Sequence, residues 1–119
     1  MIIGQTVVAE NSTGTVVYTP WFPRQGNDCT SVLDIIAISG DARVDVDMET
    51  KNSDQIDSAA GSMGSVSDKT ASTSFSCTNA KELCRYKITV KYYTTGTSIV
   101  YAHFRMLAPS WETTGAQGV

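Results

Sequence analysis

The chain has 119 residues, 41% of them hydrophobic and 18% charged, and a net charge of −3. An acidic chain is poorly suited to bind nucleic acid by neutralising phosphates over a broad surface, and no apolar run reaches the roughly 20 residues that span a bilayer. Residues 1–10 have neither the basic start nor the long apolar stretch of a signal peptide. We therefore expect one folded domain that binds neither nucleic acid nor membrane.

Two short runs rich in Val, Thr and Tyr lie near the start of the chain, at residues 6–10 and 15–19. They flank the polar segment 11–14 and predict a first hairpin. That segment contains an Asn-Ser-Thr glycosylation pattern, which we interpret as a turn because no secretory signal accompanies it. Two prolines then predict an extended loop over residues 20–28. This loop carries two large aromatic side chains, Trp21 and Phe22.

Residues 31–51 predict two strands joined by a tight turn at Gly40-Asp41. With Gly40 at the first position of a type II′ turn, Ser39 faces Ala42. This register brings apolar side chains of both strands to one face, which we expect to be the core face. They are Leu33, Ile35, Ala37, Val44, Val46 and Met48.

The opposite face of this predicted hairpin combines apolar and acidic side chains. Asp34 would face Asp47, and directly opposed carboxylates are destabilising. We expect a cation near them, either a basic side chain of a later strand or a bound calcium ion. The basic candidates are Arg85, Lys87 and Lys91.

A strand that is apolar on both faces is usually covered on both, so this face also predicts a cover from this chain or from a partner. Its apolar residues are Val32, Ile36 and Ile38.

The rest of the chain predicts one long loop and three further strands. Residues 52–69 are rich in Ser, Asp and Gly and predict the loop, with one helical turn near residues 55–60. Residues 70–78 resume strand character. The alternating segments 83–93 and 98–107 predict a final hairpin around a three-residue loop, Thr94-Thr95-Gly96. Its core face would contain Tyr86, Ile88, Val90, Val100, Ala102 and Phe104.

These elements predict an all-β fold: a single β-sandwich of about seven antiparallel strands, either jelly-roll or immunoglobulin-like. We expect residues 1–109 to form the sandwich. Residues 110–119 lose the alternating pattern and predict an extended C-terminal tail, with Trp111 as its anchor.

Catalytic chemistry has little support in the sequence. It contains none of the hydrolase, nucleotide-binding or metalloprotease patterns that carry a defined mechanism. The single histidine, His103, lies in an alternating strand, where a surface or hydrogen-bonded histidine is more common than a catalytic base. We expect neither an enzyme nor a cofactor.

The three cysteines, Cys29, Cys77 and Cys84, cannot all pair within one chain. Without a secretory signal, reduced and partly buried thiols are the first interpretation. A Cys77–Cys84 disulfide is an alternative, because a short loop could join neighbouring segments. A zinc site that adds His103 is the least favoured, since the cysteine spacing is wider than usual.

In its size, acidity, composition and strand pattern, the chain resembles the capsid decoration, or cement, proteins and minor structural proteins of tailed bacteriophages. This resemblance implies a structural protein of the virion, bound to a coat-protein shell or to copies of itself. Exposed aromatic residues and arginine are enriched in interface cores. The expected partner contacts are Trp21, Phe22, Arg24, Asp34, Asp47 and Trp111.

A carbohydrate-binding or adhesin-like module is the alternative function. In such a module an exposed aromatic ring would stack on a sugar, and carboxylates or calcium would bind the sugar hydroxyls. The aromatic candidates are Trp21, Tyr93, Tyr101 and Trp111.

Overall fold

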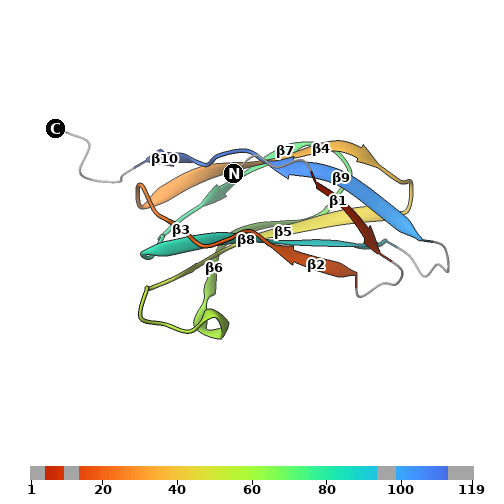
Figure 1. Cartoon of the computed structure of the whole chain (residues 1–119). Coiled ribbons are helices and arrows are strands. Elements are labelled where there is room, and N and C mark those ends of the chain that lie inside the picture. The colour runs from red at the N-terminus through yellow and green to blue at the C-terminus, as the bar shows by residue number, and fades with distance from the viewer. Residues whose placement is uncertain (1–4, 10–13, 94–98, 113–119) are drawn as a thin grey trace.

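The computed structural model describes residues 5–9, 14–93 and 99–112, which form two antiparallel β-sheets packed face to face (Figure 1). The all-β prediction is confirmed. The elements are β1 (Gln5–Ala9), β2 (Thr15–Tyr18), β3 (Phe22–Pro23), β4 (Asp28–Ile38), β5 (Ala42–Lys51), the 3-10 helix η1 (Asp57–Ala59), β6 (Gly61–Lys69), β7 (Thr73–Cys77), β8 (Leu83–Tyr92), β9 (Val100–Met106) and β10 (Ser110–Glu112). Within these ranges no helix is long and apolar enough to cross a membrane.

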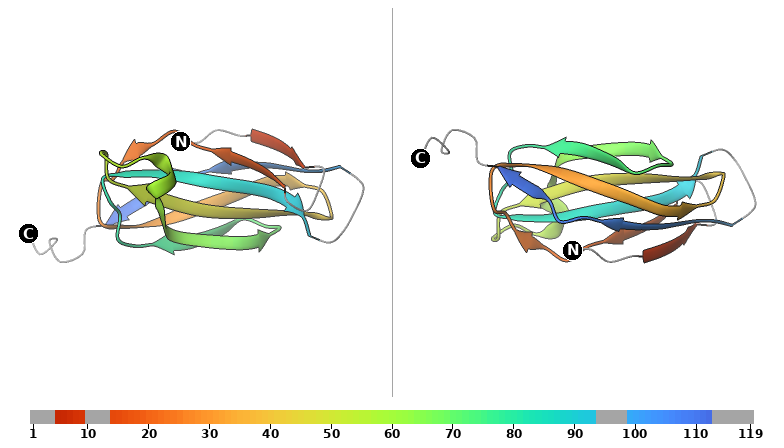
Figure 2. Two further views of the ribbon diagram at one scale, coloured as in Figure 1. Left: turned by 90° about the horizontal axis from the view of Figure 1, so that it is seen from below. Right: turned by 90° about the horizontal axis from the view of Figure 1, so that it is seen from above.

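One sheet, called sheet A here, has the strand order β1-β9-β4-β7, and the other, sheet B, has the order β2-β8-β5-β6. Two short strands complete them. β10 pairs with the first residues of β4, on the same side of β4 on which β9 pairs with its later residues. β3 pairs with the first residues of β8, on the same side of β8 as β2. The long strands of both sheets run along the same axis of the molecule (Figure 2).

The strand pairs are nested: β1 pairs with β9, β2 with β8, β4 with β7, and β5 with β6. The three predicted hairpins are therefore wrong, because in each of them the chain passes from one sheet to the other. β4 and β5, for example, lie in different sheets, and the backbone bond in the turn between them runs from the Ala42 amide to the Ser39 carbonyl. The predicted turns at residues 11–13 and 94–96 lie outside the described residues.

The predicted core faces are largely confirmed, because side-chain alternation is a local property of a strand. One residue of the predicted face departs from it: Ala37 is exposed, whereas Ile35 is half-buried and packs against the core. The cause is a bulge in β4 between Ile35 and Ala37, which reverses the alternation. The confirmed core residues are Leu33, Val44, Val46, Met48, Tyr86, Ile88, Val90, Val100, Ala102 and Phe104.

The predicted long loop over residues 52–69 is wrong in its second half, because residues 61–69 form β6. This strand pairs only with β5 in its sheet, so it needs few apolar residues, and Met63 and Val66 supply its inward side chains. The helical turn predicted near residues 55–60 is present as η1.

All three cysteines are free and buried. Cys77 lies in sheet A, directly across the β4–β7 ladder from Cys29, whereas Cys84 lies in sheet B. The alternative disulfide between Cys77 and Cys84 is therefore absent. Trp111, predicted to anchor the tail, lies in β10 opposite Cys29 and packs against the core.

Candidate functional site

The two carboxylates expected to face each other are on different sheets. Asp34 accepts hydrogen bonds from Arg105 Nε, at 2.7 Å, and from Ser72 Oγ, at 2.8 Å. Asp47 lies across from Lys87 in the β5–β8 ladder and accepts a hydrogen bond from Ser62. The arrangement that suggested calcium is thus not present. Among the described residues, no three acidic, histidine or cysteine side chains are grouped to hold a metal ion.

Arg105, rather than a residue of the later β8 strand, supplies the cation next to Asp34. Its hydrogen bond, with a smaller contribution from Ser72, lowers the pKa of the Asp34 carboxyl. The predicted cations on β8 instead face the carboxylates of β5. Arg85 pairs with Glu49 at 2.9 Å, and Lys91 pairs with Asp45 at 2.8 Å.

The outer face of sheet B is therefore densely charged and largely neutralised by its own ion pairs. In the β5–β8 ladder Asp47 lies opposite Lys87 and Glu49 lies opposite Arg85. Lys91 forms ion pairs with Asp45 and Asp68. The charged residues on this face are Arg43, Asp45, Asp47, Glu49, Lys51, Asp68, Arg85, Lys87 and Lys91. Such a face is stable in water without a partner.

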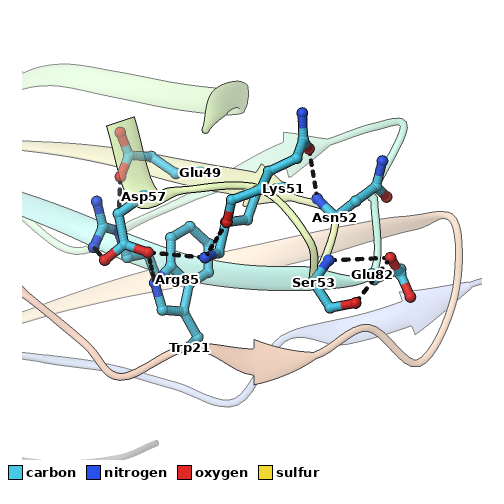
Figure 3. Close-up of polar contacts among 9 residues, drawn as sticks. Trp21, Glu49, Lys51, Asn52, Ser53, Asp57, Glu82 and Arg85 are labelled. Atoms are coloured by element: carbon cyan, nitrogen blue, oxygen red, sulfur yellow. Dashed lines mark hydrogen bonds and ion pairs between the residues drawn. The ribbon is translucent and has the colours of Figure 1, made fainter. Parts of the chain in front are cut away.

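Trp21 belongs to a compact cluster at one end of this face, which we call the Trp21 cluster (Figure 3). The Arg85 guanidinium lies 4.1 Å from the centre of the Tyr18 ring and 4.5 Å from the Trp21 ring. Lys51 Nζ lies 4.8 Å from the Trp21 ring, and this lysine is only 7% exposed. Asp57 of η1 completes the cluster: it accepts hydrogen bonds from Lys51 at 2.8 Å and Trp21 Nε1 at 3.1 Å.

This cluster holds residues 52–60 against sheet B. The Ser53 amide donates to Glu82 at 3.0 Å, and Lys51 Nζ also donates to the Gln55 carbonyl at 2.9 Å. At the tip of the segment, Ile56 is 72% exposed. The cluster thus fixes a loop whose apolar tip points to solvent.

Replacing Asp57 by asparagine is expected to loosen residues 53–60, because the side chain would lose its ion pairs with Lys51 and Arg85. Amide hydrogen exchange in this segment should become faster while exchange in the core strands stays unchanged. Asp54→Asn, in the same loop and exposed, is the matched control. Equal exchange in the two variants would contradict the role of Asp57.

Acid should have the same effect as the Asp57→Asn change. The Lys51 hydrogen bond, with smaller contributions from the charges of Lys51 and Arg85, lowers the pKa of Asp57 below its ordinary value of 3.8. A carboxyl with a lowered pKa stabilises the folded state fully above the ordinary pKa and loses this effect as the pH falls through the lowered value. The protection of the loop amides relative to a free peptide at the same pH should therefore fall only at pH below about 4.

The other expected contact residues make bonds within the chain. Phe22 packs against Tyr86, with ring centres 6.0 Å apart. Arg24 donates to the Ala80 carbonyl at 2.8 Å. Phe22 and Trp111 line one shallow groove, which lies between β3 and the segment that leads into β10. Of the rings considered for sugar stacking, Tyr93 is covered by Arg43 at 4.2 Å.

The outer face of sheet A differs from that of sheet B. Val8 and Tyr101, paired across β1 and β9, are 48% and 44% exposed. Ile36, the extra residue of the β4 bulge, is 53% exposed and lies next to the Ala37–His103 pair. We call Val8, Ile36, Ala37 and Tyr101 the apolar patch. Of the apolar residues that the sequence marked for a cover, Ile36 belongs to this patch, whereas Ile38 packs against the core.

No family model, curated protein or solved structure matches this chain.

Proposed function

We propose that the sandwich is a jelly roll. The support is the nesting of its strand pairs, β1 with β9, β2 with β8, β4 with β7 and β5 with β6. This is the pairing of one long antiparallel hairpin rolled up so that alternate strand pairs fall in opposite sheets. Jelly rolls occur in viral capsid proteins and in lectins, so the fold agrees with both candidate functions.

We propose that the protein is a non-enzymatic structural protein that acts by assembly, as a virion decoration or minor capsid protein that binds a coat-protein shell. The observation that carries this proposal is the difference between the two outer faces. The two central strands of sheet B carry charges that pair with one another, and its exposed Val16 and Tyr18 lie on the edge strand β2. Sheet A instead places exposed apolar side chains on β1, β9 and the central strand β4. Contiguous exposed apolar residues on a small domain mark an interaction surface.

Carbohydrate binding has less support from the same surfaces. Sugar stacking needs a free ring face. Lys51 and Arg85 lie over Trp21, Arg43 lies over Tyr93, and Trp111 packs against the core. Tyr101 is the remaining candidate, and it lies in the apolar patch, paired with Val8.

Co-sedimentation with empty coat-protein shells of the virus that encodes the chain would test the assembly function. We expect many copies to bind each shell, and binding to fall in Val8→Lys, which places a charge in the apolar patch. Val16→Lys is the matched control, because Val16 is 42% exposed on the edge strand β2 of the other sheet. Absence of shell binding, together with glycan binding that Tyr101→Ala abolishes, would favour the carbohydrate function instead.

A further inference from the structure

The proposed function leaves the partner of the apolar patch unidentified, and the surroundings of the patch indicate one. We propose that the patch packs against the same patch of a second copy of this chain, about a two-fold axis that lies parallel to sheet A and perpendicular to its strands. This inference rests on the proposed function, since it names one partner in the assembly. Interfaces of this isologous kind are the commonest in homo-oligomers.

The charges around the patch favour a partner that is equally uncharged there. Asp34 and Arg105, on the neighbouring rows of β4 and β9, form an ion pair of their own at 2.7 Å. His103 Nδ1 is bonded to the Thr6 hydroxyl at 2.8 Å. Among the described residues of this half of the face, no charge is left uncompensated to select a basic or an acidic protein. A second copy offers the same apolar, charge-compensated surface.

The other half of the same face limits how two copies can meet. Glu112 and Asp28 are directly opposed in the β10–β4 ladder. Because Trp111 packs inward, alternation points Glu112 outward. Asp28 and Ile36 are eight residues apart on β4, or about 25 Å. A two-fold axis next to the patch, parallel to the sheet and perpendicular to its strands, brings the two patches face to face and directs the two acidic ends away from each other. Full overlap of the two faces would instead bury these carboxylates.

Association through the sheet edge is less suited to this chain. β1 is the outermost strand of sheet A, and its unpaired edge could in principle add a strand. The Val8 carbonyl, however, already accepts a hydrogen bond from Thr15 Oγ1 at 2.6 Å. Since a backbone acceptor near the end of the short strand is occupied from the β2 side, packing of the two outer faces is the favoured contact.

Sedimentation velocity over a concentration series, from low to several hundred micromolar, tests this inference on the purified chain. We expect a monomer–dimer equilibrium whose dissociation constant rises at least about tenfold in Val8→Lys and stays within about twofold in Val16→Lys. Circular dichroism would establish that both variants are folded. Added salt should leave the dimer unchanged or strengthen it, because it screens the repulsion between two chains of charge −3.

Cross-linking provides a second readout that does not depend on weakening the dimer. Ile36→Cys should form a disulfide between two copies when oxidised glutathione is added, and Val16→Cys should not. Each bond formed would release two molecules of reduced glutathione. The native cysteines are at most 2% exposed and so should not compete. Efficient cross-linking of Val16→Cys, or its absence from Ile36→Cys, would overturn the proposed interface.

The remaining outcomes separate this inference from the proposed function. A chain that stays monomeric throughout the concentration series overturns the paired patch, and so does a dimer that dissociates in high salt. If that monomer still binds coat-protein shells, the assembly function stands with the coat protein as the partner. A dimer that binds no shell would support the paired patch and overturn the decoration role.

Discussion

Replacing Gly64 by valine is expected to lower the free energy of unfolding by about 3 kcal/mol, since an enlarged side chain at a closely packed position forces the backbone to move. Gly64 lies in β6 where the edges of the two sheets approach. A Cβ atom there would lie 2.5 Å from the Ser76 carbonyl oxygen and 2.9 Å from Cys77 Sγ. The Ser76 oxygen belongs to the backbone of β7, so rotation of a side chain cannot relieve the contact.

Urea denaturation would measure this effect, with Ser65→Val as the matched control. Ser65 is the next residue of β6, is exposed and lies opposite Asp47 on the outer face. Valine favours a strand conformation, so the control should unfold within about 0.5 kcal/mol of the wild type. A Gly64→Val midpoint equal to that of the control would show that β6 and β7 are not in close contact.

The edge strand β6 also shows where sequence reasoning failed. Its nine residues, GSMGSVSDK, contain two large apolar side chains and have the composition of a loop. Pairing with β5 makes this segment a strand, and the close approach of β7 requires glycine at position 64. Both causes are contacts with residues distant in the chain. Local propensity and periodicity do not report such contacts.

The same distinction between local and distant contacts explains the rest of the sequence predictions. Alternation within β5 and β8 identified their core faces correctly, because it depends only on the pleat of one strand. Which strands pair was predicted wrongly, because a short turn is compatible with a hairpin in one sheet and with a crossing between two sheets. The nested order pairs β1 with β9 across nearly the whole chain.

The wrong pairing also displaced part of the candidate site. Asp34 and Asp47 were expected to meet because β4 and β5 were expected to pair, and the cation next to Asp34 is Arg105 of β9. Trp21 was identified as an exposed aromatic residue, but its partner Asp57 comes from a loop that carries no signal for this contact. Ile36 was expected to need a cover and is 53% exposed, so its cover stays a prediction. Val8 was missed because one exposed valine in a strand is ordinary.

Replacing Tyr86 by alanine is expected to cost about 3–5 kcal/mol of unfolding free energy, the range for deleting a large aromatic side chain from a core. Tyr86 is fully buried at the centre of β8, where burial raises the pKa of its phenol. Its hydroxyl lies 2.7 Å from Ser31 Oγ, which is itself fully buried on β4 of the opposite sheet. The side chain therefore fills the core and connects the two sheets.

The Tyr86→Phe variant separates these two contributions, because it keeps the ring and removes the hydroxyl. It should cost about 1–2 kcal/mol, since the neighbours left to Ser31 include the sulfur atoms of Met48 and Cys77, which are weak hydrogen-bond partners.

Tyr92→Phe is the control on the same strand. Tyr92 is 3% exposed, and its hydroxyl has no hydrogen-bond partner among the described residues. Removing that hydroxyl should be neutral or slightly stabilising. Denaturation curves that show equal losses for the two phenylalanine variants would contradict a specific bond between Tyr86 and Ser31.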